Sequence, residues 1–447
     1  MRRAIWSFFL CLGLTGAGVA AETPSLVAIR DARIVTVSGA TIEKGTVVIA
    51  DGLIREIGES VAPPAGAWII EGAGLTVYPG LIDGFSAWAQ PAPPAAGPTP
   101  GGRGGGGAGA GGAPSGPPPQ RSWGPEDRPG TTSWVKAADQ VDPNDRRLEA
   151  ARSAGFTTAV TFPAGSLVSG HGAVVNLAGA TAGEMVVHPS AGLRLELNAR
   201  GVSGFPNSLM GVIAYFRQLW LDAGHYRQVK EMYEKNPAGL ARPAYDRALE
   251  GVLEATRVVL PAGSRVELER MANLASELKM PAILRGGHEA YRAADLLKSA
   301  GVSVVLNVKW PTKPRDLDPQ VEESFRTLEL RDKAPTSPIA LAAAGVPFAF
   351  TSEGLDTPRE MLTAVKKSID RGLSREAAIR ALTLDAARIY GVDGRLGSIE
   401  AGKIANLVVV KGDLFDSLGR IQMIFIDGKK FEPAPEAAPV RRGEETR

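Results

Sequence analysis

The sequence runs YPGLIDGFSAW over residues 78–88, and this stretch decides the fold that we expect. The apolar run from Leu75 to Ile82 is interrupted by Pro79 and Gly80. That pattern predicts the end of a small sheet, followed at once by a buried strand of a second unit. We therefore expect a domain boundary between Tyr78 and Pro79.

Short β-rich runs separated by turn signals precede this boundary. Between residues 26 and 70 they include two runs joined by Asp51-Gly52, a dipeptide typical of tight hairpins. Residues 405–431, near the other end of the chain, show the same pattern. Neither piece has enough apolar residues for a core of its own. We therefore expect residues 22–78 and 391–433 to pair into one small β-sandwich.

Between these two ends, strand patterns alternate with helix patterns. The β-rich runs lie at residues 156–162, 257–260, 281–284, 302–307 and 347–350. Repeated strand and helix patterns predict an α/β fold, and their number favours a (β/α)8 TIM-type barrel over residues 79–390. No glycine-rich phosphate loop follows any of these runs, which argues against an open nucleotide-binding sheet.

Two segments have the composition of disordered chain. Residues 91–130 begin with a long run rich in glycine and proline, which cannot bury enough side chains to become ordered. We expect a disordered insertion there, directly after the first barrel strand. It is either a tolerated surface insertion or a functional lid, because barrel enzymes do their chemistry on that face. Residues 434–447 predict a disordered tail.

The first 21 residues have the three parts of a secretory signal peptide. Basic residues at positions 2 and 3 precede an apolar run over residues 4–19, and small residues follow at Ala20 and Ala21. The apolar run is shorter than the roughly 20 residues that span a membrane. We expect an exported protein, periplasmic or extracellular, without a membrane span after cleavage, and a short membrane anchor is the alternative.

The charge of the expected mature chain is balanced. The chain has 50 basic and 48 acidic residues, and the signal peptide removes two arginines, which leaves 48 of each. This balance argues against nucleic acid and anionic membranes as partners. The single cysteine, Cys11, also lies in the signal peptide, so the mature chain can form neither disulfides nor thiolate metal sites.

Three motifs resemble those of the amidohydrolase superfamily, and of its imidazolonepropionase-like branch in particular. They are PGLID at residues 79–83, GFTT at residues 155–158 and GRLGSIEAGKIANLVV at residues 394–409. The resemblance implies a barrel with a composite sandwich beside it. It also implies a metal-dependent hydrolase of carbon–nitrogen bonds other than peptide bonds.

In that superfamily a histidine pair, His-x-His, follows PGLID, and it holds one or two divalent metals with two more histidines and a late aspartate. The metal makes a bound water acidic enough to attack an amide-like carbonyl. Here Phe85 and Ala87 stand at the two histidine positions, and neither can coordinate a metal. The resemblance leaves His288 and Glu353 as metal ligands, with Glu353 also as the catalytic residue. Ser352 stands at the aspartate position in a second alignment.

We expect His171 and Ser352 to contact the substrate. His171 lies in a glycine-rich segment, and a comparable loop lines the pocket in relatives of this superfamily. A lone histidine is more often a hydrogen-bonded structural residue, so a structural role for His171 stays open. For His188 and His225 we favour the structural interpretation.

Two functions remain open. The first is a non-catalytic or weakly active member that binds a small molecule or is the partner of an active paralogue, since one or two leftover ligands hold a metal poorly. The second is an active hydrolase of cyclic amides or small peptides, with zinc or another divalent metal in a reduced one-metal site at His288 and Glu353. A homo-oligomer is compatible with both, and fold alone does not decide between them.

Overall fold

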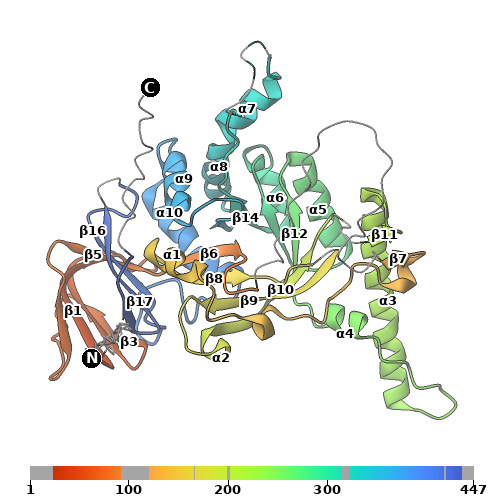
Figure 1. Cartoon of the computed structure of the whole chain (residues 1–447), viewed down its shortest axis with the longest axis horizontal. Coiled ribbons are helices and arrows are strands. Elements are labelled where there is room, and N and C mark those ends of the chain that lie inside the picture. The colour runs from red at the N-terminus through yellow and green to blue at the C-terminus, as the bar shows by residue number, and fades with distance from the viewer. Residues whose placement is uncertain are drawn as a thin grey trace, which may run out of the picture.

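The computed structural model shows a sheet built from both ends of the chain beside an eight-stranded barrel with helices around it (Figure 1). It describes residues 24–91, 120–165, 167–198, 202–314, 318, 320, 322–416 and 419–434. The expected α/β fold, with a barrel and a separate terminal sheet, is confirmed. The expected signal peptide, the core of the insertion (residues 92–119) and the tail after residue 434 lie outside the described residues.

The terminal sheet joins early and late strands. Its strands are β1 (Leu26–Ile34), β2 (Ile42–Ala50), β3 (Leu53–Gly58), β4 (Trp68–Glu71), β5 (Leu75–Pro79), β16 (Leu407–Lys411), β17 (Arg420–Ile426) and β18 (Lys429–Phe431). They follow the order β18-β17-β16-β5-β1-β2-β3, with β4 also beside β1. The two ends meet where β5 pairs antiparallel with β16, with Leu407 opposite Pro79. Buried Val27, Val77 and Phe425 share one apolar core.

The barrel sheet begins directly after that joint. Its strands are β6 (Leu81–Ser86), β8 (Phe156–Thr161), β9 (Val168–Asn176), β10 (Val186–Leu195), β12 (Val258–Ala262), β13 (Ala282–Gly286), β14 (Ser303–Asn307) and β15 (Phe348–Thr351). All neighbours are parallel except β9, which runs antiparallel to β8 and β10. The expected strand–helix alternation fails here, because the short link between β8 and β9 has no room for a crossover helix.

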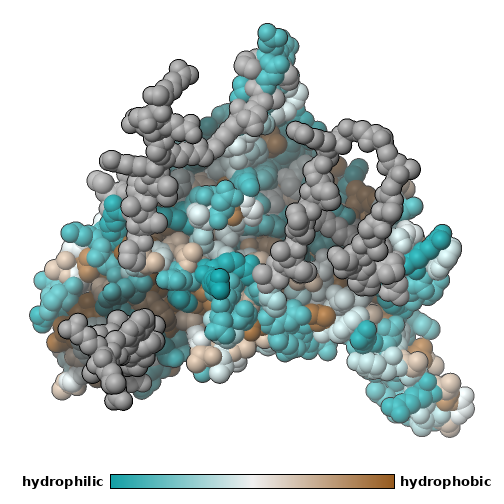
Figure 2. Space-filling model, in the orientation of Figure 1, coloured by the Kyte–Doolittle hydropathy of each residue, from teal (hydrophilic) through white to brown (hydrophobic). Residues whose placement is uncertain are grey.

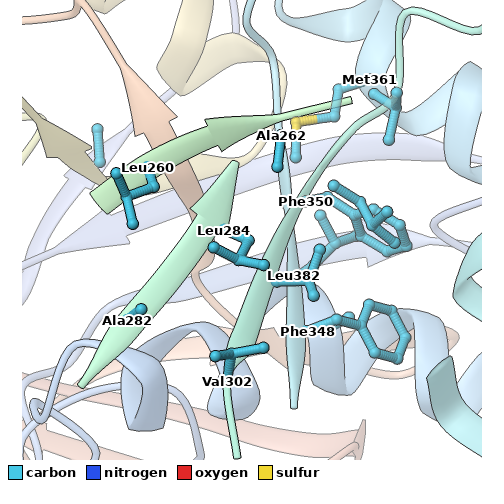
Figure 3. Packing of buried hydrophobic residues seen from close by; sticks show 14 of the residues in the cluster. Leu260, Ala262, Ala282, Leu284, Val302, Phe348, Phe350, Met361 and Leu382 are labelled. Carbon is cyan, nitrogen blue, oxygen red and sulfur yellow. The ribbon is translucent and has the colours of Figure 1, made fainter. Parts of the chain in front are cut away.

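Helices cover the outside of the barrel. They are α1 (Arg147–Ser153), α2 (Ala182–Met185), α3 (Leu209–Lys235), α4 (Arg247–Leu253), α5 (Arg265–Glu277), α6 (Ala294–Ala300), α7 (Phe325–Lys333), α8 (Ser337–Ala344), α9 (Arg359–Ile369), α10 (Arg375–Leu382) and α11 (Leu384–Ile389). Figure 3 shows Leu284 and Phe350 of the strands in one apolar layer with Met361 of α9 and Leu382 of α10. Alternate strand residues such as Ile283 point into the barrel instead, as period-2 geometry requires.

One end of the barrel interior is closed by α11 and the residues after it. Buried Tyr390 donates its hydroxyl to the carbonyl of Gly84 in β6, and Arg257 at the start of β12 bonds the carbonyl of Ile389. Ile389 and Tyr390 belong to the same apolar cluster as the inward-facing strand residues. The opposite end, where the strands finish, is therefore the accessible mouth of the barrel.

The first and last strands, β6 and β15, are joined at the mouth by side chains. Buried Asp83 accepts hydrogen bonds from the backbone N–H of Ser352, at 3.2 Å, and from its hydroxyl. The hydroxyl of Thr351 donates to the carbonyl of Phe85. The described residues show no backbone pairing between these two strands. Polar side chains therefore close the seam of the barrel.

The last part of the expected insertion, residues 120–130, is folded, contrary to the expectation of disorder up to residue 130. The strand β7 (Gln120–Ser122) pairs with β11 (Val202–Gly204), and a 3-10 turn, η1 (Pro125–Asp127), follows it. The backbone N–H of Trp123 donates to Asp127 at 2.7 Å, which fixes this turn. Residues 120–130, which were expected to belong to the disordered insertion, therefore include a strand and a 3-10 turn.

The helix α3 continues beyond the barrel as a projecting arm (Figure 1). Its buried residues all lie between Val212 and Ala223, while Met232 near its end is exposed. Hydrophilic and hydrophobic residues are mixed on that end (Figure 2). Among the helices of the described residues, none combines the length and the apolar character needed to cross a membrane.

Candidate functional site at the barrel mouth

Two phenylalanines form the floor of the barrel mouth. The rings of Phe85, on β6, and Phe162, directly after β8, stack with centroids 4.9 Å apart and 20° between their planes. Both side chains are buried. One ring of this aromatic pair, that of Phe85, therefore stands where the resemblance places the first metal-binding imidazole.

Two guanidinium groups lie over the ring of Phe85. The Cζ atom of Arg285, on β13, is 4.4 Å from the ring centroid, and the Cζ atom of Arg194, on β10, is 5.3 Å away. Cations at such distances are attracted by the negative face of the ring. Positive charge therefore stands at the centre of the mouth, carried by side chains of the protein itself.

Two carboxylates hold these arginines. Arg285 bonds Glu353 through one nitrogen and Glu196 through the other, at 2.7 Å. Arg194 donates from Nε to the same oxygen of Glu196, also at 2.7 Å. The side chain of Arg285 is only 10% exposed, against 33% for that of Glu353. Because these side chains are largely buried, the attractions between them are strong, but a charge that lost its partner would be costly. Removal of one member therefore destabilises the others.

The backbone around Glu353 is fixed by neighbouring strands. Its N–H donates to the hydroxyl of Thr351 at 3.0 Å, and its carbonyl accepts from the side-chain amide of Asn307, on β14, at 3.1 Å. Glu353 is therefore held in place to receive Arg285. This is where the structure places Glu353, the residue expected to be both the catalytic residue and a metal ligand.

Asp83 and Ser352 lie beside this network at the barrel seam. Burial raises the pKa of Asp83 to about 7, although hydrogen bonds from Ser352, Phe85 and Thr351 oppose that rise. The hydroxyl of Ser352 is committed to Asp83. Ser352 still borders the mouth cavity, so its position is compatible with the expected substrate contact.

The two candidate histidines point to different neighbours. Buried His171, on β9, has its Nε2 atom 2.8 Å from the carbonyl of Gly251 in α4. His288, after β13, lies against Trp310 with ring centroids 6.0 Å apart and hydrogen-bonds the backbone of Asn307. Burial lowers the pKa of both imidazoles, so both are neutral near pH 7. Nε2 of His288 has no partner among the described residues.

A cavity of about 720 Å³ opens above the phenylalanine floor. Its walls come from β6 and the residues after it, from α1, and from the loop between β15 and α9. Phe85, Phe162, Trp88, Arg194, Glu353 and Asp356 are among its lining residues. Such a volume is typical of sites for small molecules. A second cavity, of about 810 Å³, borders Glu196 and Arg285 on the other side of the charged network.

The residues at the mouth do not fit the divalent metal that the resemblance implies. Over the described ranges, no group of three or more His, Cys, Asp or Glu side chains could hold a metal ion. His171, His288 and Glu353 are not brought together in such a group. Glu353 is engaged by Arg285, and a guanidinium next to a carboxylate repels a second cation. We derive no chemical step through a metal.

Sequence reasoning missed the central residues Arg194, Glu196 and Arg285. A signal for them exists: each is a charged residue at the end of an apolar strand, where burial demands a partner. Opposite charges at the ends of different strands could have been paired, because all these ends meet at one face of a barrel.

The comparisons with known proteins agree with this fold. Residues 245–434 match the model of the amidohydrolase family. Amidohydrolase tasK of Hapsidospora irregularis is 24% identical over 330 residues, which are 66% of this chain but 32% of that protein. The chain therefore spans about a third of the length of this curated relative.

Two solved structures share the architecture. An amidohydrolase from Thermotoga maritima MSB8 superposes with a TM-score of 0.71 at 22% identity, covering 91% of this chain and 100% of its own. A prolidase complexed with N-methylphosphonate-L-proline reaches a TM-score of 0.51 at 16% identity, with the same coverage. At these identities the likeness concerns the fold.

Proposed function

Because the chain has the amidohydrolase fold and matches that family over residues 245–434, we propose that it is a non-catalytic member that binds a small molecule at the barrel mouth. One observation carries this proposal: the guanidinium of Arg285 lies over Phe85 and binds Glu353. A fixed organic cation thus stands between the first and last strands, where the family resemblance implies a metal. A guanidinium cannot supply a metal-bound hydroxide.

The small-molecule role rests on what remains of the mouth. The cavity of about 720 Å³ has an aromatic floor and a few polar groups, as ligand sites commonly do. The prolidase with the same architecture was solved with a phosphonate ligand, so the fold can hold small molecules. The alternative role, as the partner of an active paralogue, is compatible with the same barrel mouth without a catalytic metal.

We also propose that the protein is exported, periplasmic or extracellular. The support is the sequence of residues 1–21, with basic residues, an apolar run and small residues in that order. N-terminal sequencing of protein recovered from the periplasm tests this, with Glu22 expected as the first residue. Recovery of the uncleaved chain from the cytoplasm would refute it.

Elemental analysis of the purified full chain tests the loss of catalysis. After expression in zinc-supplemented medium, we expect well below one equivalent of any transition metal per chain, because the described residues offer no ligand group. We also expect no turnover of cyclic amides or dipeptides with added zinc, manganese or cobalt.

Two variants make the elemental analysis decisive. Near-stoichiometric zinc that is lost in His288→Ala or Glu353→Gln, but kept in His225→Ala, would establish the one-metal hydrolase and overturn the proposal. His225 is the matched control because its side chain is exposed on α3, away from the mouth. A zinc content unchanged by all three variants would indicate adventitious binding and leave the proposal standing.

A further inference from the structure

A buried carboxyl and a hydroxyl that borders the mouth cavity share a hydrogen bond at the barrel seam. The hydroxyl of Ser352 donates to Oδ2 of Asp83. Ser352 is among the residues that line the cavity of about 720 Å³, whereas Asp83 is fully buried. The protonation state of a carboxyl without solvent contact is thus connected, through one hydrogen bond, to the surface that would meet a ligand.

The two oxygens of Asp83 have different neighbours. Oδ1 accepts the backbone N–H of Phe85 at 3.1 Å, and the N–H of Ser352 lies 3.2 Å from Oδ1 and 3.3 Å from Oδ2. These N–H groups can donate a hydrogen bond but cannot accept one. A proton on this carboxyl therefore belongs on Oδ2, the oxygen that faces the hydroxyl of Ser352.

No cation forms an ion pair with Asp83 within the described parts of the chain. Its neighbour β8 has no titratable side chain, and Tyr390, after α11, stays neutral because burial raises its pKa. Glu353, after β15, is bound by Arg285. The other charged residues of the surrounding elements make no ion pair with Asp83: Arg257, Arg375, Glu376, Arg380, Asp385 and Arg388. A buried carboxyl without a cation takes up a proton readily, and burial raises the pKa of Asp83 to about 7.

Protonation of Asp83 reverses the direction of its hydrogen bond with Ser352. The new O–H on Oδ2 has to donate, because a buried donor without an acceptor is costly. Two hydroxyls interact with this carboxyl, those of Thr351 and Ser352. The hydroxyl of Thr351 already donates to the carbonyl of Phe85 and accepts the N–H of Glu353 at 3.0 Å. Oγ of Ser352 is therefore the acceptor, and its own hydrogen has to turn away from Asp83.

We propose, resting on the small-molecule role above, that the Asp83–Ser352 pair determines by its protonation which hydrogen-bonding group a ligand must offer to Ser352. With Asp83 ionised, Ser352 donates to it and presents only acceptor lone pairs to the cavity. With Asp83 protonated by a proton from water, Ser352 accepts from it and presents its O–H to the cavity. The mouth therefore favours ligands with an acceptor group, such as a ketone, at acidic pH, and loses that preference as Asp83 ionises.

Calorimetric titration of the full chain with two neutral probes of similar shape tests this preference. 1-Indanone offers a carbonyl acceptor and indole an N–H donor, and neither probe titrates between pH 5 and pH 9. We expect the affinity for 1-indanone to be about threefold higher at pH 5 than at pH 9, because one hydrogen bond is gained. The affinity for indole should not fall as the pH rises.

Three variants assign the effect to the Asp83–Ser352 pair. Ser352→Ala should remove the pH dependence, and Ser352→Thr, which keeps a hydroxyl, should retain it. Asp83→Asn should give the acidic behaviour at both pH values, because the amide group donates to Ser352 as the protonated carboxyl does. The matched control Ser299→Ala removes an exposed hydroxyl on α6 and should leave the pH dependence unchanged.

Infrared spectra follow the Asp83–Ser352 pair without any ligand. The C=O stretch of a protonated carboxyl should appear as the pH falls through about 7, be absent in Asp83→Asn and shift in Ser352→Ala. The proposal is overturned if no such band titrates in the native chain, if 1-indanone binds equally at both pH values, or if Ser352→Ala keeps the pH dependence. None of these outcomes contradicts small-molecule binding itself. Failure of both probes to bind at millimolar concentration contradicts that role, and the infrared result then decides the pair.

Discussion

At the scale of single residues, the chemistry of the barrel mouth depends on whether its central cation is a guanidinium or a metal ion. Arg285 presents a fixed set of N–H donors, so it joins two carboxylates without any exchangeable ligand. A metal would instead leave a position open for water. In this barrel the central cation thus links the ends of β10, β13 and β15 instead of activating water.

Replacing Arg285 by alanine should destabilise the protein by about 3 kcal/mol, because the partly buried Glu353 would lose its ion-pair partner and Glu196 would keep Arg194 alone. Urea denaturation followed by circular dichroism measures this. Arg30→Ala is the matched control, since the Arg30–Glu71 pair is exposed and should contribute less than about 1 kcal/mol. Equal losses in both variants would show that Arg285 contributes no more to stability than an exposed ion pair does.

The buried carboxyl of Asp83 gives stability a dependence on pH. Its folded pKa of about 7 lies above the ordinary pKa of an aspartate, about 4, so the folded state binds the proton more tightly than the unfolded state. The contribution of this group to stability is therefore greatest below pH 4 and declines as pH rises towards 7, by at most about 1.4 kcal/mol per pH unit.

The variant Asp83→Asn isolates this effect. The free energy of unfolding of the native chain minus that of the variant should decrease between pH 5 and pH 7 and then stay level. Denaturation at a series of pH values measures it. A difference that rises with pH would mean that the folded pKa is depressed instead.

At the scale of elements, the seam between β6 and β15 is the weakest part of the barrel wall. Side chains of Asp83, Thr351 and Ser352 join these strands, whereas backbone ladders join all the other neighbours. A few side-chain bonds resist opening less than a ladder does. The seam also borders the mouth cavity, so motion of β15 would change the site directly.

Thr351→Val should lower stability by about 1–2 kcal/mol, because the buried carbonyl of Phe85 and the N–H of Glu353 both lose their partner. Hydrogen exchange in β15 should accelerate more than in β13. The control Thr363→Val changes an exposed threonine on α9 and should do neither. Unchanged exchange in β15 would indicate that the seam is held by packing alone.

The elements show what sequence can and cannot predict. The strand after Pro79 and the pairing of the two chain ends followed from apolar runs and turn residues, and both are confirmed. The antiparallel β9 was not predicted, because an apolar run does not reveal its direction in a sheet. Direction is set by the length of the link to β8, and the turn residues in that link, Pro163 and Gly165, mark a turn without fixing the direction of the next strand.

The site was harder to predict than the fold. Loss of a histidine pair can be read from Phe85 and Ala87, but what replaces it depends on side chains from β10, β13 and β15 that meet only in three dimensions. The assignment to the imidazolonepropionase-like branch stays a prediction.

At the scale of the whole molecule, the terminal sheet ties the end of the chain to its beginning. β5 lies between β1 and β16, so strands from the two ends share one core that includes Val77 and Leu407. The first barrel strand, β6, starts two residues after the end of β5, so the pairing of β5 in the terminal sheet also holds the start of the barrel in place. Loss of either end should affect both units.

A chain that stops at Asn406 should fail to fold, because β5 would lose its partner and Leu407 and Phe425 would leave the core. Soluble yield and circular dichroism measure this. A chain that stops at Ala434 keeps every described strand and should melt at the same temperature as the full chain. A stable barrel in the shorter chain would show that the two units fold independently.

The place of β5 in the sheet also determines when, during synthesis, the terminal sheet can form. During synthesis at about 5–20 residues per second, β5 leaves the ribosome tens of seconds before β16 exists. Through that interval one edge of β5 has no partner, and an open strand edge invites pairing with other nascent chains. Strands β1 to β5 therefore stay without their late partners until β16 to β18 have been synthesised. The native sheet can form only when synthesis is nearly complete.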